Sequence, residues 1–379
     1  MKNIFSRNNK MEIKSINYRK YIIAFAVMTG AIVLLNVMFR VSPTFSTNYC
    51  RTIFASVSKI FGAFWGLFPF SVIEIILYLC AGIVAYCIIR LVVRLIKYHR
   101  KSNICYFTYK LKRYLLNLVC IILAALIILT LNDISLYNRL SFSEAAAINT
   151  SARSTEELIK VFEILRNDIN ENASKVNRNE DGIFTISDTD ISKDTPIAMS
   201  TLKEDYPFMP NYYPRPKKIL SSKLMSHTRL QGIYSPYTLE ANYNNDMPDA
   251  EKLHTACHEL AHLAGFIHED EANFIGYLAC VKSDNPEFVY SGSLSIISYF
   301  LPELRRNVSN DRYVELVKSI DINARKDMIF IDEYWSRFDT KVAKVSGKIN
   351  NAFIISNGDK EGERRYSMVV DLVLAHYLE

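Results

Sequence analysis

Three long apolar runs constrain the fold of this chain more than any other feature, because each is close to the ~20 residues that a helix needs to cross a bilayer. They occupy about residues 21–39, 70–93 and 114–131. The only charges inside the second run are Glu74 and Arg90. The first run is longer than the ~7–15 apolar residues of a cleavable signal peptide, and no small-x-small cleavage site follows it. We therefore predict that residues 1–131 form a membrane anchor of three helices.

Lysine and arginine are concentrated on one side of these runs. They crowd the tail before the first run and the segment between the second and third runs. The loop between the first two runs holds only Arg40, Arg51 and Lys59. Strongly basic flanks stay in the cytoplasm, so we expect a cytoplasmic N-terminus and, after three crossings, an extracytoplasmic domain beyond Leu131. The formal net charge of +6 then reflects topology. We expect no nucleic-acid partner, because the polar domain has no basic face.

The loop between the first two runs has an amphipathic pattern. Large apolar residues recur at helical spacing over residues 53–68, and Pro69 ends the pattern. Two placements are open: a helix lying in the outer membrane interface, or a helix packed beneath the C-terminal domain. Glu74 lies near the outer end of the second run. We expect its carboxylate to reach the interface rather than to join a polar pathway.

Residues 132–379 are more polar and long enough for one sizeable core. Ser154 and Glu157 form a capping box before an amphipathic helix, and the prolines of residues 207–216 exclude helix there. The β-forming residues of 232–243 predict one or two short strands. Further helices are expected at residues 287–301, from 311, at 322–345 and at 367–378. The predicted fold is mainly α: three transmembrane helices, then a mostly helical α+β domain, zincin-like, with a few short strands.

The sequence His-Glu-Leu-Ala-His at residues 258–262 is an HExxH motif. Residues four apart lie one above the other on a helix, so the imidazoles of His258 and His262 can bind a single zinc ion. Glu259, about 100° further round the axis, then lies beside any metal-bound water. This is the arrangement that a zinc metallopeptidase needs.

The motif helix is predicted to begin near Pro248 and to end at Gly265, a residue suited to a left-handed C-terminal cap. Glu251 and Lys252 make this segment too polar to cross a membrane. We expect His254, one turn before the motif, to support the site or to lie on the surface rather than to bind the metal.

Three residues are candidates for the third zinc ligand. His268 completes the spacing HExxHxxGxxH of metzincins. Glu269 and Glu271 open a second predicted helix, in which Glu269 and Asn273 resemble the E-x-x-A-N element of gluzincins. There the glutamate binds zinc, and the residue one turn later orients a ligand histidine. Glu269 is the preferred ligand, because a His-His-carboxylate site is a known catalytic arrangement. Glu271 and His268 remain alternatives.

Several segments follow a three-span anchor in a fixed order. They read GIYSP at 232–236, EAN at 240–242, HELAH at 258–262, EDEANFIGYLAC at 269–280, and late stretches at 362–366 and 369–374. This order resembles an uncharacterised family of bacterial three-span membrane proteins with an HExxH zinc-peptidase-like, gluzincin-like C-terminal domain. The resemblance covers nearly the whole chain and implies a location in the bacterial cell membrane. It implies little about substrate. His268 is an unusual residue for that family at its position, which counts against the metzincin spacing.

These features predict a membrane-anchored zinc-dependent metallopeptidase that acts on a peptide or protein substrate outside the cytoplasm. Zn²⁺ is held by His258, His262 and Glu269, and Glu259 is the general base for a zinc-activated water. The alternative is a non-catalytic zinc-binding membrane receptor or assembly factor. An intact Glu259 favours the enzyme, since a structural site does not require it. The candidates for stabilising the developing charge are Tyr234, Tyr243, Tyr290, His227 and Tyr366.

Two further sets of residues flank the predicted site. We expect Cys257 and Cys280, on adjacent helices, to be buried free thiols rather than a disulfide. Five polar or aromatic side chains in the C-terminal third are candidates to line a cleft, although aromatics at helical spacing more often form core. They are Ser291, Tyr299, Tyr334, Trp335 and Tyr366.

Overall fold

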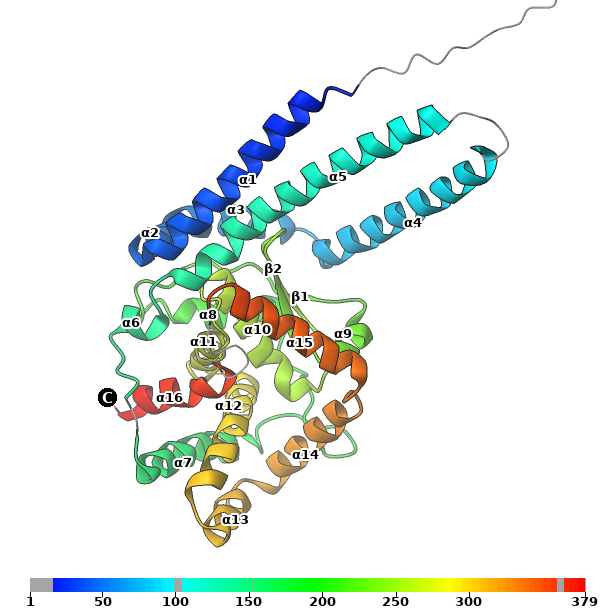
Figure 1. Ribbon diagram of the computed structural model, residues 1–379. Helices are drawn as coiled ribbons and strands as arrows, with labels where there is room; N and C mark the ends of the chain where they lie inside the picture. Colours follow the sequence, from blue (N-terminus) through cyan, green and yellow to red (C-terminus); the bar gives the residue numbers. More distant parts are fainter. Residues whose placement is uncertain (1–15, 99–103, 152, 360–364, 379) are drawn as a thin grey trace, which may run out of the picture.

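Three long helices project from one end of a mostly helical domain (Figure 1). The computed structural model describes residues 16–98, 104–151, 153–359 and 365–378. The long helices are α1 (Tyr18–Val41), α4 (Val72–Tyr98) and α5 (Ile104–Asn132). The segments long and apolar enough to cross a membrane are Tyr18–Val41, Val72–Val93 and Thr108–Asn138. The prediction of three apolar helices is confirmed, and these helices fit a multi-pass protein in a lipid bilayer.

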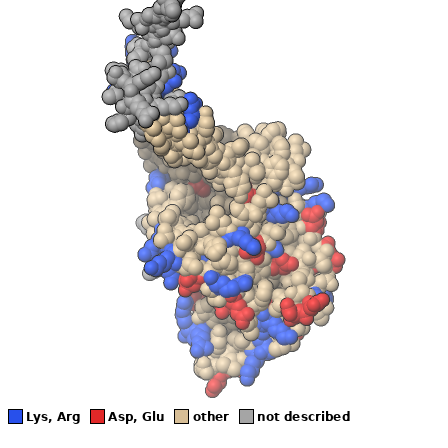
Figure 2. All heavy atoms as spheres, turned by 90° about the vertical axis from the view of Figure 1, so that its right-hand side faces the viewer, with Lys and Arg blue, Asp and Glu red and all other residues tan. Residues whose placement is uncertain are grey.

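The membrane helices bury little of their own apolar surface. At most 11% of each apolar window is buried, so most of these side chains need a lipid environment to be stable. Polar pairs join α1 to α5: Tyr21 Oη donates to Asn117 Oδ1 at 2.7 Å, and Asn36 Nδ2 donates to Thr130 Oγ1 at 3.3 Å. Figure 2 shows that charged side chains are scattered over the domain, whereas the adjoining part of the apolar helices is uncharged.

The loop between α1 and α4 packs one side beneath the domain. It contains α2 (Pro43–Tyr49), a π-helical segment η1 (Cys50–Phe54) and α3 (Ala55–Trp65). Ser58 Oγ donates to Leu263 O at 3.4 Å, and a Cβ at Gly62 would lie 2.9 Å from Pro214 Cβ. The second of the two placements is therefore confirmed. The opposite side exposes Ile53, Ile60, Phe61, Phe64 and Leu67, which is the surface that an interfacial helix presents to lipid.

A buried carboxylate fastens the start of α4 to the domain. Glu240 Oε1 and Oε2 accept from the amides of Val72 and Ile73 at 3.0 and 2.9 Å. These amides have no partner within the helix, so Glu240 caps it from a distant part of the chain. Lys217 Nζ donates to Glu240 Oε1 at 2.6 Å, and both side chains are at most 5% exposed. The carboxylate that caps α4 is therefore also a member of a buried ion pair within the domain.

Glu74 makes a second connection between anchor and domain. Its carboxylate accepts from the backbone amides of Leu220 and Ser221 at 2.7 and 2.8 Å, and the residue is 4% exposed. We predicted a carboxylate that reaches the membrane interface. The structure gives it specific partners there, in the turn that precedes α9 (Ser222–Thr228).

A small sheet and several helices form most of the core of the domain. The sheet has the order β1 (Lys217–Lys218), β3 (Glu240–Tyr243), β2 (Gly232–Ser235), with β1 parallel and β2 antiparallel to β3. The helices are α7 (Thr155–Asn172), α10 (Asp249–Leu263), α11 (Glu269–Val281), α12 (Pro286–Asn307) and α16 (Arg365–Leu378). α10 packs against the sheet, α11 and α12. The predicted short strands and the capping box that starts α7 are confirmed.

One predicted helix is wrong. The expected single helix over residues 322–345 is two helices, α14 (Ile322–Ser336) and α15 (Lys341–Ser356). The break occurs where Thr340 Oγ1 accepts from the amide of Ala343 at 3.3 Å, because a side-chain cap starts a new helix there. The remaining elements are η2 (Ile134–Asn138), α6 (Phe142–Ala146), α8 (Ile191–Thr201) and α13 (Asn310–Lys318).

Candidate metal centre

The motif helix α10 has the bounds that its sequence predicts. Pro248 precedes the first turn, which carries Asp249 and Glu251, acids that are favourable at a helix N-terminus. After the last turn Gly265 has φ +92°, and the amide of Phe266 donates back to the helix. A Cβ at Gly265 would also lie 2.7 Å from Arg139 Nη1. Glycine is therefore needed there for two reasons.

The two motif histidines are buried, and hydrogen bonds hold both rings. His258 Nδ1 lies 2.9 Å from Asn273 Oδ1, and His262 Nδ1 lies 2.8 Å from Phe266 O. Both partners are acceptors, so each Nδ1 carries a proton, and Nε2 is the ring nitrogen that could bind a cation once it is deprotonated. The ring centroids are 4.7 Å apart. This orientation suits two histidines that share one cation.

Glu269 completes a group of three metal-binding side chains. Its Oε2 lies 3.1 Å from His258 Nε2. One ligand atom from each of His258, His262 and Glu269 lies within 4.8 Å of the other two. These are the donors that catalytic zinc sites use. Asn273 occupies the position predicted for it, since it lies one turn after Glu269 and holds a motif histidine.

The protonation of the two imidazoles differs. Burial lowers the pKa of His262 to about 4, so this ring is neutral near pH 7 and able to bind a metal. Burial alone would also lower the pKa of His258. The hydrogen bond and negative charge of Glu269, the charge of Glu259 and the hydrogen bond with Asn273 together outweigh burial and raise the pKa. The proton shared by His258 and Glu269 is one that a bound metal would displace.

The other two candidates for third ligand point elsewhere. The Glu271 carboxylate accepts from the amide of Phe142. His268 Nδ1 lies 2.9 Å from Asp359 Oδ2, and its Nε2 lies 3.2 Å from Tyr137 O. Of the three candidates, the structure thus brings only Glu269 together with the motif histidines. The literal metzincin spacing does not place His268 beside them.

Glu259 is buried beside this group. It is 4% exposed, and its Oε2 has no hydrogen-bond partner within the described part of the chain. Burial raises its pKa to about 8. Gly232 of β2 packs directly against it, because a Cβ at that position would lie 2.2 Å from Glu259 Oε1. The sheet therefore comes as close to this carboxylate as a glycine permits.

Strand β2 lies at the edge of the sheet. It pairs with β3 on one side, and no other described strand pairs with it. Ile233 on this strand is 45% exposed. An edge strand next to a reactive site can hold an extended peptide by main-chain pairing.

His254, which we predicted to support the site or to lie on the surface rather than to bind the metal, lies outside the group of His258, His262 and Glu269. Its Nε2 is 3.0 Å from Asn273 O, and burial lowers its pKa to about 4. Asn273 therefore contacts His254 through its carbonyl and His258 through its side chain. Asn273 Nδ2 also donates to Tyr299 Oη at 3.4 Å.

The candidates for stabilising a developing charge are spread over the domain. The ring of Tyr234 lies 6.1 Å from His262, but its hydroxyl donates to Asn132 O at 2.6 Å. Tyr290 donates to Asp327, and His227 packs against Phe338. Tyr243 is buried in β3, and the side chain of Tyr366 lies outside the described residues. Tyr234, whose ring lies near His262, therefore has a hydroxyl already bound elsewhere.

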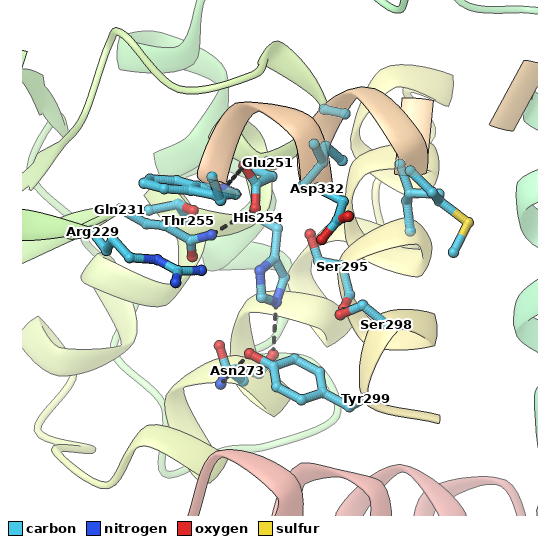
Figure 3. Close-up of a pocket in the computed structure, with 15 residues that line it drawn as sticks. Arg229, Gln231, Glu251, His254, Thr255, Asn273, Ser295, Ser298, Tyr299 and Asp332 are labelled. Atoms are coloured by element: carbon cyan, nitrogen blue, oxygen red, sulfur yellow. Dashed lines mark hydrogen bonds between the residues drawn. The ribbon is translucent and has the colours of Figure 1, made fainter. Parts of the chain in front are cut away.

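Cys257 and Cys280 lie side by side on α10 and α11. Their sulfur atoms are 3.9 Å apart, and both thiols are buried and free, as predicted. A cavity of about 270 Å³ adjoins the site beyond His254 (Figure 3). Tyr299 and Trp335 line this cavity as expected. Ser291 donates to Ala250 O, and Tyr334 pairs with Ser226 Oγ, so these two lie in other contacts.

One comparison with known proteins gives a match. The family described as "Protein of unknown function (DUF3810)" matches residues 49–374, from the loop after α1 to the last helix. No curated protein and no solved structure matches the chain.

Proposed function

Since the chain belongs to the DUF3810 family of unknown function, we propose an activity from the geometry of its own residues: it is a membrane-anchored zinc-dependent metallopeptidase. The observation that carries this proposal is the convergence of His258, His262 and Glu269 within 4.8 Å beside the buried carboxylate of Glu259. A structural zinc site usually has four protein ligands and has no use for a carboxylate beside the metal, whereas a catalytic site has three ligands and an open position.

The residues fit a zinc ion. His258 and His262 would bind through Nε2, because hydrogen bonds hold both Nδ1 atoms. Glu269 would add a carboxylate oxygen, which leaves a fourth position for water or substrate. When bound, zinc would polarise the peptide carbonyl and lower the pKa of a water molecule.

Glu259 supplies the proton transfer in this proposal. Its unpartnered Oε2 takes a proton from the attacking water as the new C–O bond forms. It then delivers that proton to the peptide nitrogen as the C–N bond breaks. Gly232 leaves room for the carboxylate in this position, since any larger side chain would overlap it, and the open edge of β2 aligns the substrate backbone.

The identity of the third ligand can be tested directly. Glu269→Ala should lose most bound zinc, because it removes one of three donors. His268→Ala should retain the metal, since His268 is bound to Asp359 and Tyr137. Asn273→Ala should weaken zinc binding ~10-fold or more by freeing the His258 ring. Metal analysis of the purified variants measures this. An empty site in His268→Ala with a full site in Glu269→Ala would reverse the assignment.

The proposed side of the membrane rests on the basic residues that flank the apolar helices. A reporter that is active only outside the cytoplasm should be active when fused after Glu379. The same reporter should be silent when fused near Ser102. The opposite pattern would put the domain in the cytoplasm and change the class of available substrates.

A further inference from the structure

The cavity beside the candidate metal centre lies along the same face of α10. Glu251, Thr255, His258 and His262 recur at helical spacing, so they line one side of that helix. The first two line the cavity, and the last two belong to the candidate metal centre. Asn273 and His254 form the boundary between the two spaces. The cavity therefore adjoins the candidate metal centre, and residues of the same helix face serve both.

The distance between the cavity and the candidate metal centre suits neighbouring residues of one extended peptide substrate. Glu251 precedes His258 by seven residues, which is roughly 10 Å along a helix axis at about 1.5 Å per residue. An extended chain spans about 3.3–3.6 Å per residue. A long side chain within a residue or two of the reacting bond can cover this distance. The volume of about 270 Å³ accommodates one such side chain, and is below the ~300–1,000 Å³ of sites that enclose a whole drug-sized ligand.

The walls of the cavity combine apolar surface with carboxylates. Leu294, Met328 and Ile331 supply apolar side chains, and Trp335 supplies an aromatic one. The side chains of Glu251, His254 and Asp332 point into the same space (Figure 3). Hydroxyls of Ser295, Ser298 and Tyr299 add further polar groups. A chain of methylene groups that ends in a cation matches such a lining, because the stem packs on apolar walls and the head reaches a carboxylate.

Glu251 is prepared to receive a cation. Its two oxygens accept from neutral donors, Gln231 Nε2 at 2.6 Å and Trp335 Nε1 at 2.8 Å. Burial raises its pKa to about 7, which shows that these neutral partners do not compensate the charge fully. Arg229 also lines the cavity and carries a positive charge, but it is exposed at the rim beside Gln231.

We propose that this cavity is the subsite for a lysine or arginine side chain of the substrate, with Glu251 as its counter-ion. The inference rests on the proposed peptidase function for the substrate class. It also makes a separate claim about binding, which can be measured without catalysis.

The chain provides its own reporter for this measurement. It contains only two tryptophans, Trp65 and Trp335, and Trp335 bonds to Glu251 inside the cavity. In the full-length protein carrying Trp65→Phe and Glu259→Gln, fluorescence then reports on the cavity and peptides stay intact. The probes are short alanine-serine peptides that differ at one position, scanned along the peptide, which holds Lys, Arg, Met or Glu.

Lysine and arginine peptides should change Trp335 emission and bind ~10-fold or more tightly than the methionine peptide. Adding Glu251→Gln should remove that preference while zinc content stays unchanged, because glutamine still accepts from Trp335. The control Glu315→Gln alters an exposed carboxylate on α13 and should preserve the preference. Equal binding of all peptides, no binding, or preference for the glutamate peptide through Arg229 would each overturn the proposal.

The two proposals can fail separately. If the zinc-loaded parent binds lysine peptides at Trp335 but cleaves none, the peptidase function fails and the subsite stands. If the parent cleaves peptides with no preference for a basic residue, or if Glu251→Gln cleaves with the preference unchanged, the function stands and the subsite is wrong.

Discussion

Replacing Glu259 by glutamine should lower peptide cleavage by at least ~100-fold, the amount expected when a general base is removed. Zinc content and thermal unfolding should remain close to those of the parent. Glutamine has nearly the same shape and still fits against Gly232, but its amide cannot accept the proton. The measurement is the cleavage of a peptide library by the purified full-length protein, with metal analysis of the same samples.

Two controls separate proton transfer from metal binding. His262→Ala removes a proposed ligand and should lose the metal along with activity. Glu315→Gln makes the same chemical change at an exposed site and should leave both unchanged. The parent protein could instead bind zinc tightly and cleave no peptide, and the Glu259→Gln variant could behave like the parent in cells. That result would favour a non-catalytic zinc-binding receptor or assembly factor.

Glu240→Ala should destabilise the folded protein by about 3–5 kcal/mol, because it leaves the buried ammonium of Lys217 without its partner. The change also removes the cap from the first amides of α4. For a domain of this size the expected loss in Tm is roughly 6–20 °C. Thermal unfolding in detergent measures this.

Matched variants identify the cause of that loss. Glu240→Gln keeps an acceptor for Val72 or Ile73 but removes the charge, so it isolates the contribution of the ion pair. Glu171→Ala breaks an exposed pair with Lys175 and should leave the Tm close to that of the parent, because solvent screens such pairs. If Glu240→Ala unfolds at the same temperature as Glu171→Ala, the buried pair does not hold the anchor to the domain.

The local signals in the sequence predicted much of the candidate site. Pro248 and Gly265 mark the ends of α10. Proline favours a helix start and glycine a left-handed helix end, and both effects depend only on the local backbone. Glu269 and Asn273 could be paired because one helical turn separates them. The same locality explains the wrong prediction for residues 322–345, where the apolar pattern continues across a break made by the Thr340 cap.

Contacts between distant segments could not be predicted in this way. The carbonyl of Phe266 that orients His262 belongs to the backbone, which carries no residue-specific signal. The contact of Gly232 with Glu259 depends on how the sheet meets α10. Trp335 meets Glu251 across 84 positions of sequence, so the cavity exists only once α14 has packed against α10.

The buried carboxylates that join the anchor to the domain fix the position of the candidate metal centre relative to the membrane helices. A domain on a loose linker would sweep through a large volume above the bilayer and meet substrates anywhere within it. Here Glu240 accepts hydrogen bonds from the first turn of α4, and Glu74 on that same helix accepts hydrogen bonds from the turn before α9. The candidate metal centre is thereby held at a fixed distance from the membrane helices. For the proposed peptidase, this attachment would restrict cleavage to peptide bonds that lie at one distance from the bilayer.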